Sequence, residues 1–170
     1  MRTVAILVAG LVVLGLAAAP AHAETKVLVD GPTAGIAPQH DVLRARIANR
    51  KRAVVVTVRF RDLRRGAPVY TNVALMWSRD GDGRFVSAVR RDGTRRAVLV
   101  EPDSDEFTGD PVPCAGLRAR WSNRRNTIRF RVPHTCLEPT ARRLRVKVVA
   151  GFWSHTSRGD YTRFLGVRRG

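Results

Sequence analysis

Hydrophobic and polar residues alternate along most of the chain from residue 42 onward, and no segment keeps a helical period. In the stretch 52–63, Val54, Val56, Val58 and Phe60 would share one side of an extended strand. Similar alternation recurs, between turns rich in Gly and Asp, at 42–49, 69–77, 85–90, 94–101, 117–132 and 143–153. This pattern predicts an all-β fold: an antiparallel β-sandwich of about eight strands, similar to immunoglobulin or jelly-roll domains.

The segment 101–113 interrupts the alternation, because it carries five acidic residues and three prolines. Proline cannot donate a hydrogen bond to a neighbouring strand, so an interior strand is excluded here. We expect this segment to form a loop that crosses between the two sheets. The polar tail after residue 153 is expected to pack along a sheet edge.

The first 23 residues have the pattern of a secretory signal peptide: a basic Arg2, an apolar run over 4–19, and Ala21 and Ala23 at the positions of a cleavage site. The alternative is an uncleaved N-terminal anchor. The segment carries no twin arginine and no cysteine at the cleavage point, which favours Sec-type export without a lipid anchor. We therefore expect an extracellular protein whose mature part, 24–170, is a single sandwich domain of 170 − 23 = 147 residues.

Cys114 and Cys136 are the only cysteines of the chain. In an exported protein an even number of cysteines predicts a disulfide rather than free thiols. A metal or redox role is disfavoured because the chain contains no CxxC motif. The bond would close the hairpin CAGLRARWSNRRNTIRFRVPHTC and stabilise the fold by roughly 3 kcal/mol.

Several short motifs carry a family resemblance: Asp30 followed by HDV at 40–42, Asp62-Leu63 after a strand, and Val132-Pro133-x-x-Cys136-Leu137. With these motifs the stretch 29–153 resembles small secreted β-sandwich proteins of high-GC Gram-positive bacteria. It is distantly similar to DOMON-type and carbohydrate-binding sandwiches as well. The resemblance implies the fold and the disulfide, and it implies no activity.

The chain is strongly basic, with a formal net charge of +17, and 28 of its 31 basic residues are arginines. A biased codon composition could produce so many arginines without selection for binding. Several of them nevertheless alternate with apolar residues, which places them on the solvent side of their strands. The candidate anion-binding residues are Arg118, Arg120, Arg129, Arg131, Arg143, Arg145 and Lys147, and the pairs Arg44/Arg46 and Arg59/Arg61 have the same spacing.

These rows would bind a phosphate- or carboxylate-bearing partner only if they merge into one surface. The test that the sequence suggests is whether the four arginines of the hairpin lie beside Arg143, Arg145 and Lys147. If they do not, the hairpin arginines are expected to be an ordinary solvated face. The partner would be an anionic polymer of the cell envelope, nucleic acid or an acidic protein, and the protein is expected to be a monomer.

Trp153 is a candidate stacking residue, since strand alternation places it on the same side as Arg145 and Lys147. The alternative is that the C-terminal tail covers it, through Tyr161 or Phe164. Trp77 and Trp121 fall on the apolar side of their strands and are expected to be core residues.

No motif of the chain indicates catalysis, and we expect neither a cofactor nor a metal. The turn Ser78–Gly83 resembles the start of a calcium loop, but Val89 occupies the position of the last ligand of an EF-hand, which excludes the EF-hand. A simple hairpin turn is favoured, and calcium binding by the turn is the alternative. Arg158-Gly159-Asp160 spells a cell-adhesion tripeptide, which we interpret as chance. The sequence thus predicts a non-catalytic binding protein for anionic polymers. A neutral carbohydrate-binding module that uses exposed aromatics is the alternative, and an extracellular enzyme is the third hypothesis.

Overall fold

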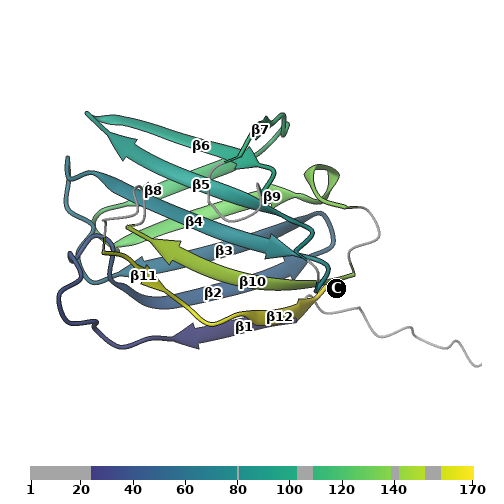
Figure 1. Cartoon of the computed structure of the whole chain (residues 1–170), viewed down its shortest axis with the longest axis horizontal. Helices are drawn as coiled ribbons and strands as arrows, with labels where there is room; N and C mark the ends of the chain where they lie inside the picture. The colour runs from purple at the N-terminus through teal and green to yellow at the C-terminus, as the bar shows by residue number, and fades with distance from the viewer. Residues whose placement is uncertain (1–23, 80, 103–108, 139–141, 152–157) are drawn as a thin grey trace, which may run out of the picture.

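The computed structural model describes residues 24–79, 81–102, 109–138, 142–151 and 158–170, and these residues form two antiparallel sheets (Figure 1). Sheet A contains, in spatial order, β1 (Glu24–Val29), β2 (Val42–Arg50), β3 (Ala53–Phe60), β9 (Thr127–Pro133) and β8 (Arg118–Ser122). Sheet B contains β11 (Asp160–Tyr161), β10 (Arg143–Ala150), β4 (Val69–Met76), β5 (Gly83–Arg91), β6 (Thr94–Val100) and β7 (Pro111–Val112). β12 (Leu165–Arg168) also pairs with β10. The predicted all-β antiparallel sandwich is confirmed.

The alternation that predicted the strands also builds the core between the sheets. Val54, Val56 and Val58 of β3 are fully buried, as is Phe130 of the neighbouring β9. Sheet B faces them with equally buried residues such as Val73. Each such side chain contributes roughly 1.5–3 kcal/mol through its removal from water.

The chain crosses between the sheets three times. It passes from β3 to β4, runs through β5, β6 and β7 as a meander, and returns to sheet A for the β8–β9 hairpin. It then passes to β10, which pairs with β4. The crossover expected at 101–113 is misplaced, because this segment connects β6 to β7 within sheet B, where Pro111 and Val112 form a short edge strand, and the chain passes to sheet A only after β7. Proline is compatible with an edge strand because the missing N–H faces away from the ladder.

The eight strands expected from the pattern correspond to β2, β3, β4, β5, β6, β8, β9 and β10. The additional strands β1, β7, β11 and β12 have two to six residues each and are edge strands or attach to β10. β11 and β12 come from the C-terminal tail, so the tail packs along a sheet edge as predicted. The expected signal peptide at 1–23 lies outside the described residues.

The polar motifs of the family resemblance form a network at one end of the sandwich. Asp41 is fully buried and pairs with the Nε of Arg61 at 3.2 Å. Asp160 is also buried, and its carboxylate accepts a hydrogen bond from the backbone N–H of Val42 at 2.7 Å. Leu63 is a core residue whose backbone N–H donates to the side chain of Asn126. These motif residues therefore hold the fold together, and the buried Asp160 cannot present an adhesion tripeptide.

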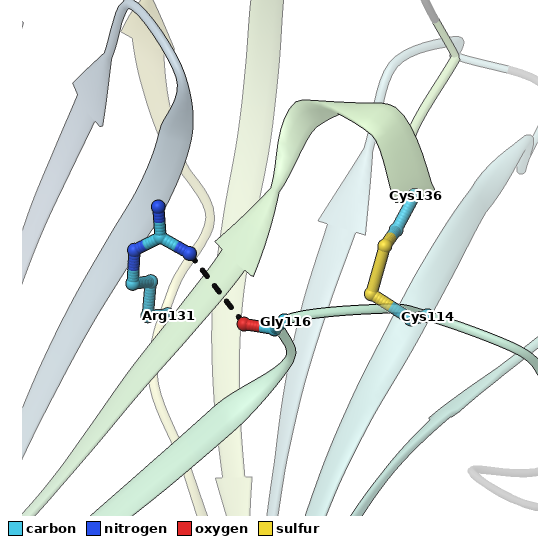
Figure 2. Close-up of a disulfide and its surroundings, with 4 residues drawn as sticks. All are labelled: Cys114, Gly116, Arg131 and Cys136. Atoms are coloured by element: carbon cyan, nitrogen blue, oxygen red, sulfur yellow. Dashed lines mark hydrogen bonds between the residues drawn. A yellow bond between two sulfur atoms is a disulfide. The ribbon is translucent and has the colours of Figure 1, made fainter.

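The disulfide joins the segment before β8 to the short 3-10 turn His134–Cys136 that follows β9, as Figure 2 shows. The Cα atoms of Cys114 and Cys136 are 5.4 Å apart, within the usual range for a disulfide. Beside it, Nη1 of Arg131 donates to the carbonyl oxygen of Gly116 at 3.5 Å (Figure 2). The predicted pairing of the two cysteines is confirmed.

Candidate anion-binding face

The hairpin of β8 and β9 places its arginines in pairs. Arg118 lies opposite Arg131, and Arg120 lies opposite Arg129. All four are exposed, because Ile128 and Phe130 take the alternate positions of β9 and turn into the core. Directly opposed residues in an antiparallel pair have Cβ atoms about 4.5–5.5 Å apart, so two guanidinium groups can reach the same anion.

The central strands of sheet A extend this basic surface. Thr57 of β3 lies between Arg129 on one side and Arg46 of β2 on the other, and Arg59 lies opposite Arg44. The exposed arginines of four adjacent strands therefore share one outer side. We call this set the arginine face: Arg44, Arg46, Arg59, Arg118, Arg120, Arg129 and Arg131. Four strands about 4.8 Å apart span about 14 Å across the sheet.

The three basic residues of β10 do not belong to this surface. β10 pairs with β4 in sheet B, and the outer sides of the two layers of a sandwich point in opposite directions. Moreover, Arg145 lies 4.6 Å from the ring centroid of Phe164, and Nζ of Lys147 lies 4.9 Å from that of Tyr161. The hairpin arginines therefore do not share a surface with Arg143, Arg145 and Lys147, as the binding hypothesis required. They share a surface with the arginines of β2 and β3 instead.

Acidic residues do not neutralise the arginine face within the described part of the chain. Five ion pairs form among the described residues, and none includes a member of the face. Arg61, which was expected to extend the row of Arg59, instead pairs with the buried Asp41 and donates to the carbonyl oxygen of Ile36. The other pairs lie in turns or at strand ends away from the face, as with Arg64–Asp62 and Arg91–Asp92.

The non-basic residues of the outer side of sheet A are small or aliphatic. In the described strands the register places these residues among the arginines: Thr25, Val27, Val29, Ala48, Val55, Thr57, Ser122 and Thr127. None of them is aromatic. This side of sheet A can therefore bind through charge and hydrogen bonds, and its described residues provide no ring on which a nucleobase or sugar could stack.

The aromatic residues lie elsewhere. Trp77 and Trp121 are half-buried and pack against the core, as predicted. The candidate stacking residue Trp153 lies outside the described residues. Trp121 contacts two arginines of sheet B, with the guanidinium carbons of Arg90 and Arg95 at 5.4 and 5.7 Å from its ring centroid.

Arg90 is a residue that the sequence reasoning missed. It is only 2% exposed, its Nε donates to the carbonyl oxygen of Ala67 at 2.8 Å, and its Nη2 donates to that of Arg64. Burial, followed by the positive charge of Arg95, lowers the pKa of Arg90. Its position could have been read from the alternation, since it follows Val86 and Ala88 on the inward side of β5. The side chain of Arg90 thus links sheet B to Trp121 of sheet A and stabilises the contact between the two sheets.

The remaining candidate residues do not converge. The Ser78–Gly83 turn is a hydrogen-bonded hairpin turn, in which Oγ of Ser78 accepts from the N–H of Asp82, while its residue 80 lies outside the described residues. Asp82 borders an open depression of about 520 Å³, together with Trp77, Arg84 and Glu101. Among the described residues, no three His, Cys, Asp or Glu side chains are grouped so as to hold a metal ion.

Two of the three histidines in the expected mature chain, His40 and His134, are among the described residues. Both are buried, and burial is the main cause that lowers the pKa of each. Nε2 of His134 donates a hydrogen bond to the carbonyl oxygen of Arg50 at 2.9 Å. His40 packs near Gly151 at the opposite end from the disulfide turn. Neither lies on the arginine face.

Comparison of the chain with protein-family models, with curated proteins and with solved structures gives no match. Among the described residues, no helix is long and apolar enough to span a membrane. The case for a function therefore depends on the arrangement of the side chains themselves.

Proposed function

We propose that this protein is an exported, non-catalytic binding protein and that its arginine face binds an anionic polymer. The observation that carries the proposal is the register of sheet A, which brings seven exposed arginines from four strands onto one side. The proposal replaces the grouping with β10 that the sequence suggested. It keeps the same chemistry, because guanidinium groups bind phosphate and sulfate oxygens through charge-assisted hydrogen bonds.

The geometry suits an extended ligand with regularly spaced charges. The pairs Arg118/Arg131 and Arg120/Arg129 follow each other along the hairpin, and residues two positions apart on a strand are separated by about 6.8 Å. Arg46 continues the row of Arg120 and Arg129 across β3. A chain that carries a phosphate or sulfate on each unit could contact several of these positions at once, whereas a single small anion would use one pair.

The cost of this arrangement also supports a binding role. Like charges placed directly opposite each other on adjacent strands destabilise a sheet, and sheet A has three such pairs, of which the third is Arg44/Arg59. A biased codon composition explains many arginines, but it does not explain why they oppose each other. A bound polyanion would remove this repulsion.

The lack of aromatic residues among the described outward positions favours a polymer recognised by its charges alone. Single-stranded nucleic acids are usually held by stacking of the bases on aromatic side chains. We therefore expect binding to linear polyphosphate or to a sulfated polysaccharide, with affinity that falls steeply with salt. If all seven arginines contact phosphates, the slope of log K against log salt would approach about −5.

The test uses labelled linear polyphosphate and fluorescence anisotropy at increasing salt concentrations. The variant Arg120→Gln/Arg129→Gln should bind about tenfold more weakly at low salt, and each lost contact should reduce the steepness of the salt dependence by about 0.7. The matched control is Arg64→Gln/Arg91→Gln, which removes the same charge from two exposed arginines outside the face.

Equal weakening in the two variants would mean that only net charge matters, and the proposal would then be rejected. Binding of neutral dextran that persists at high salt would support the carbohydrate-binding alternative instead.

A further inference from the structure

A second group of basic residues gathers at one end of the sandwich, and its Arg50, at the end of β2, shares the outer side of sheet A with Arg46. It combines the β2–β3 turn, the start of β10 and the end of β12, and we call it the terminal cluster: Arg50, Lys51, Arg52, Arg142, Arg168 and Arg169. All six residues are exposed. Figure 1 shows the C-terminus of the chain beside the start of β10.

Backbone hydrogen bonds bring these segments together. The N–H of Arg169 donates to the carbonyl oxygen of Arg142 at 2.8 Å, and the N–H of Gly170 donates to that of Asn49 at 3.2 Å. The side chain of Arg169 reaches from sheet B to sheet A, where its Nη2 donates to the carbonyl oxygen of Lys51 at 3.0 Å. The basic segments are therefore fastened to each other and cannot move apart to relieve their repulsion.

The 3-10 turn next to the disulfide forms the base of the cluster. The N–H of His134 donates to the carbonyl oxygen of Arg52 at 3.2 Å, and its Nε2 lies 2.9 Å from the carbonyl oxygen of Arg50. These two contacts hold both ends of the β2–β3 turn. His134 is buried and feels the charge of Arg169, so it can report on an anion bound to the cluster.

Glu24 offsets part of the charge of the terminal cluster, because its carboxylate interacts with Arg168. The same carboxylate pairs with Nζ of Lys26 at 2.9 Å and accepts the backbone N–H of Arg168. The guanidinium groups of Arg142 and Arg168 are in none of the ion pairs among the described residues. The cluster therefore keeps a net positive charge.

We propose that the terminal cluster is a second anion-binding site, which takes a compact group bearing two or more phosphates. Its segments meet through direct hydrogen bonds at one end of the sandwich, whereas the arginine face spreads its charges over four strands. Several charge-assisted contacts to one ligand make such a site selective for multiply charged anions over monovalent ones. The inference does not depend on the function proposed for the arginine face.

The test is calorimetric titration of the full-length mature protein with inorganic tripolyphosphate at low salt. We expect saturable binding that the variant Arg142→Gln/Arg168→Gln weakens about tenfold, since two charge-assisted contacts are lost. Arg64→Gln/Arg91→Gln, which changes two exposed arginines outside both the arginine face and the terminal cluster, should leave this binding unchanged. A second arm uses phosphatidylcholine vesicles with and without phosphatidylglycerol. Binding to the anionic vesicles that requires Arg142 and Arg168 would assign the phosphates to a lipid surface.

The NMR signal of His134 gives an independent readout. Burial lowers the pKa of His134, the hydrogen bond to Arg50 raises it, and the charge of Arg169 lowers it further. An anion bound in the terminal cluster should raise the pKa of His134 and leave that of His40, at the other end of the sandwich, unchanged. The proposal is overturned if tripolyphosphate and anionic vesicles both fail to bind, or if the cluster variant binds as well as the control variant.

Discussion

Removal of the disulfide should destabilise this protein by an amount that follows from the length of the loop it closes. Cys114 and Cys136 are 22 positions apart, and the chain-entropy relation for a loop of that length gives about 3.4 kcal/mol at 25 °C. The bond ties the crossover that follows β7 to the turn that follows β9, so in the unfolded chain it holds together segments that would otherwise separate. Both cysteines are also half-buried against the core, which adds a smaller packing contribution.

The perturbation is the double variant Cys114→Ala/Cys136→Ala, and the assay is equilibrium unfolding in urea followed by tryptophan fluorescence. Trp121 lies within the closed loop and should report on the hairpin directly. With a dependence of about 2 kcal/mol per molar urea, the midpoint should fall by about 1.7 M. The parent protein under reducing conditions is the control, because it loses the cross-link and keeps both sulfur atoms.

Two results would refute this reasoning. A midpoint that falls by less than about 0.5 M would show that the loop is already constrained in the unfolded chain, so that the entropy argument does not apply. A large loss of stability in the alanine variant together with an unchanged midpoint in the reduced parent would assign the effect to sulfur packing rather than to the cross-link.

Two further predictions concern single residues at the end of the sandwich opposite the disulfide. Burial raises the pKa of Asp160 from its ordinary value of 3.8, so its contribution to stability is full below that pH and is lost as the pH rises through the folded-state pKa. Asp160→Asn keeps an acceptor for the N–H of Val42 and should remove this loss of stability at high pH. Asp160→Ala leaves that N–H without its acceptor and should cost about 1–3 kcal/mol at every pH. Urea unfolding between pH 3 and 8 measures both effects, and equal pH profiles for Asp160→Asn and the parent would contradict the expectation for Asp160→Asn. Gly151 has φ +86°, and a Cβ at this position would lie 3.1 Å from the Cβ of His40. Gly66 has a similar φ of +80° but open space around it, so Gly66→Ala is the control. Gly151→Ala should therefore lower the free energy of unfolding by more than Gly66→Ala does. The control change alone should cost about 1 kcal/mol, and equal losses would show that the crowding around Gly151 relaxes freely.

Much of the fold could be predicted because the side-chain period of a strand is a local property. The apolar row of β3 and the arginines of β8 and β9 were assigned to their sides correctly, since neighbouring residues of any pleated strand point to opposite faces. The same rule places Arg90 on the inward side of its strand, although a charged side chain is not expected there. The structure explains this position, because two carbonyl oxygens and Trp121 surround the guanidinium group.

The short strands could not be predicted in the same way. β11 has two residues and β12 has four, which is too few for a periodic pattern to be recognised. They form because β10 offers a free edge, a feature that exists only after sheet B has assembled. The terminal cluster has the same origin, since it joins segments that lie more than a hundred residues apart in the sequence.

By itself, then, the sequence determined the eight strands of the alternating pattern, the inward and outward side of each, the pairing of the two cysteines and the large excess of arginine. Only the tertiary structure decided which strands are neighbours. The hairpin arginines join Arg44, Arg46 and Arg59, because β9 pairs with β3, while Arg145 and Lys147 lie on the opposite layer against Phe164 and Tyr161. The physical reason is that the face of a residue follows from the local pleat, whereas the partner of a strand depends on where the chain crosses between sheets and which core it buries there.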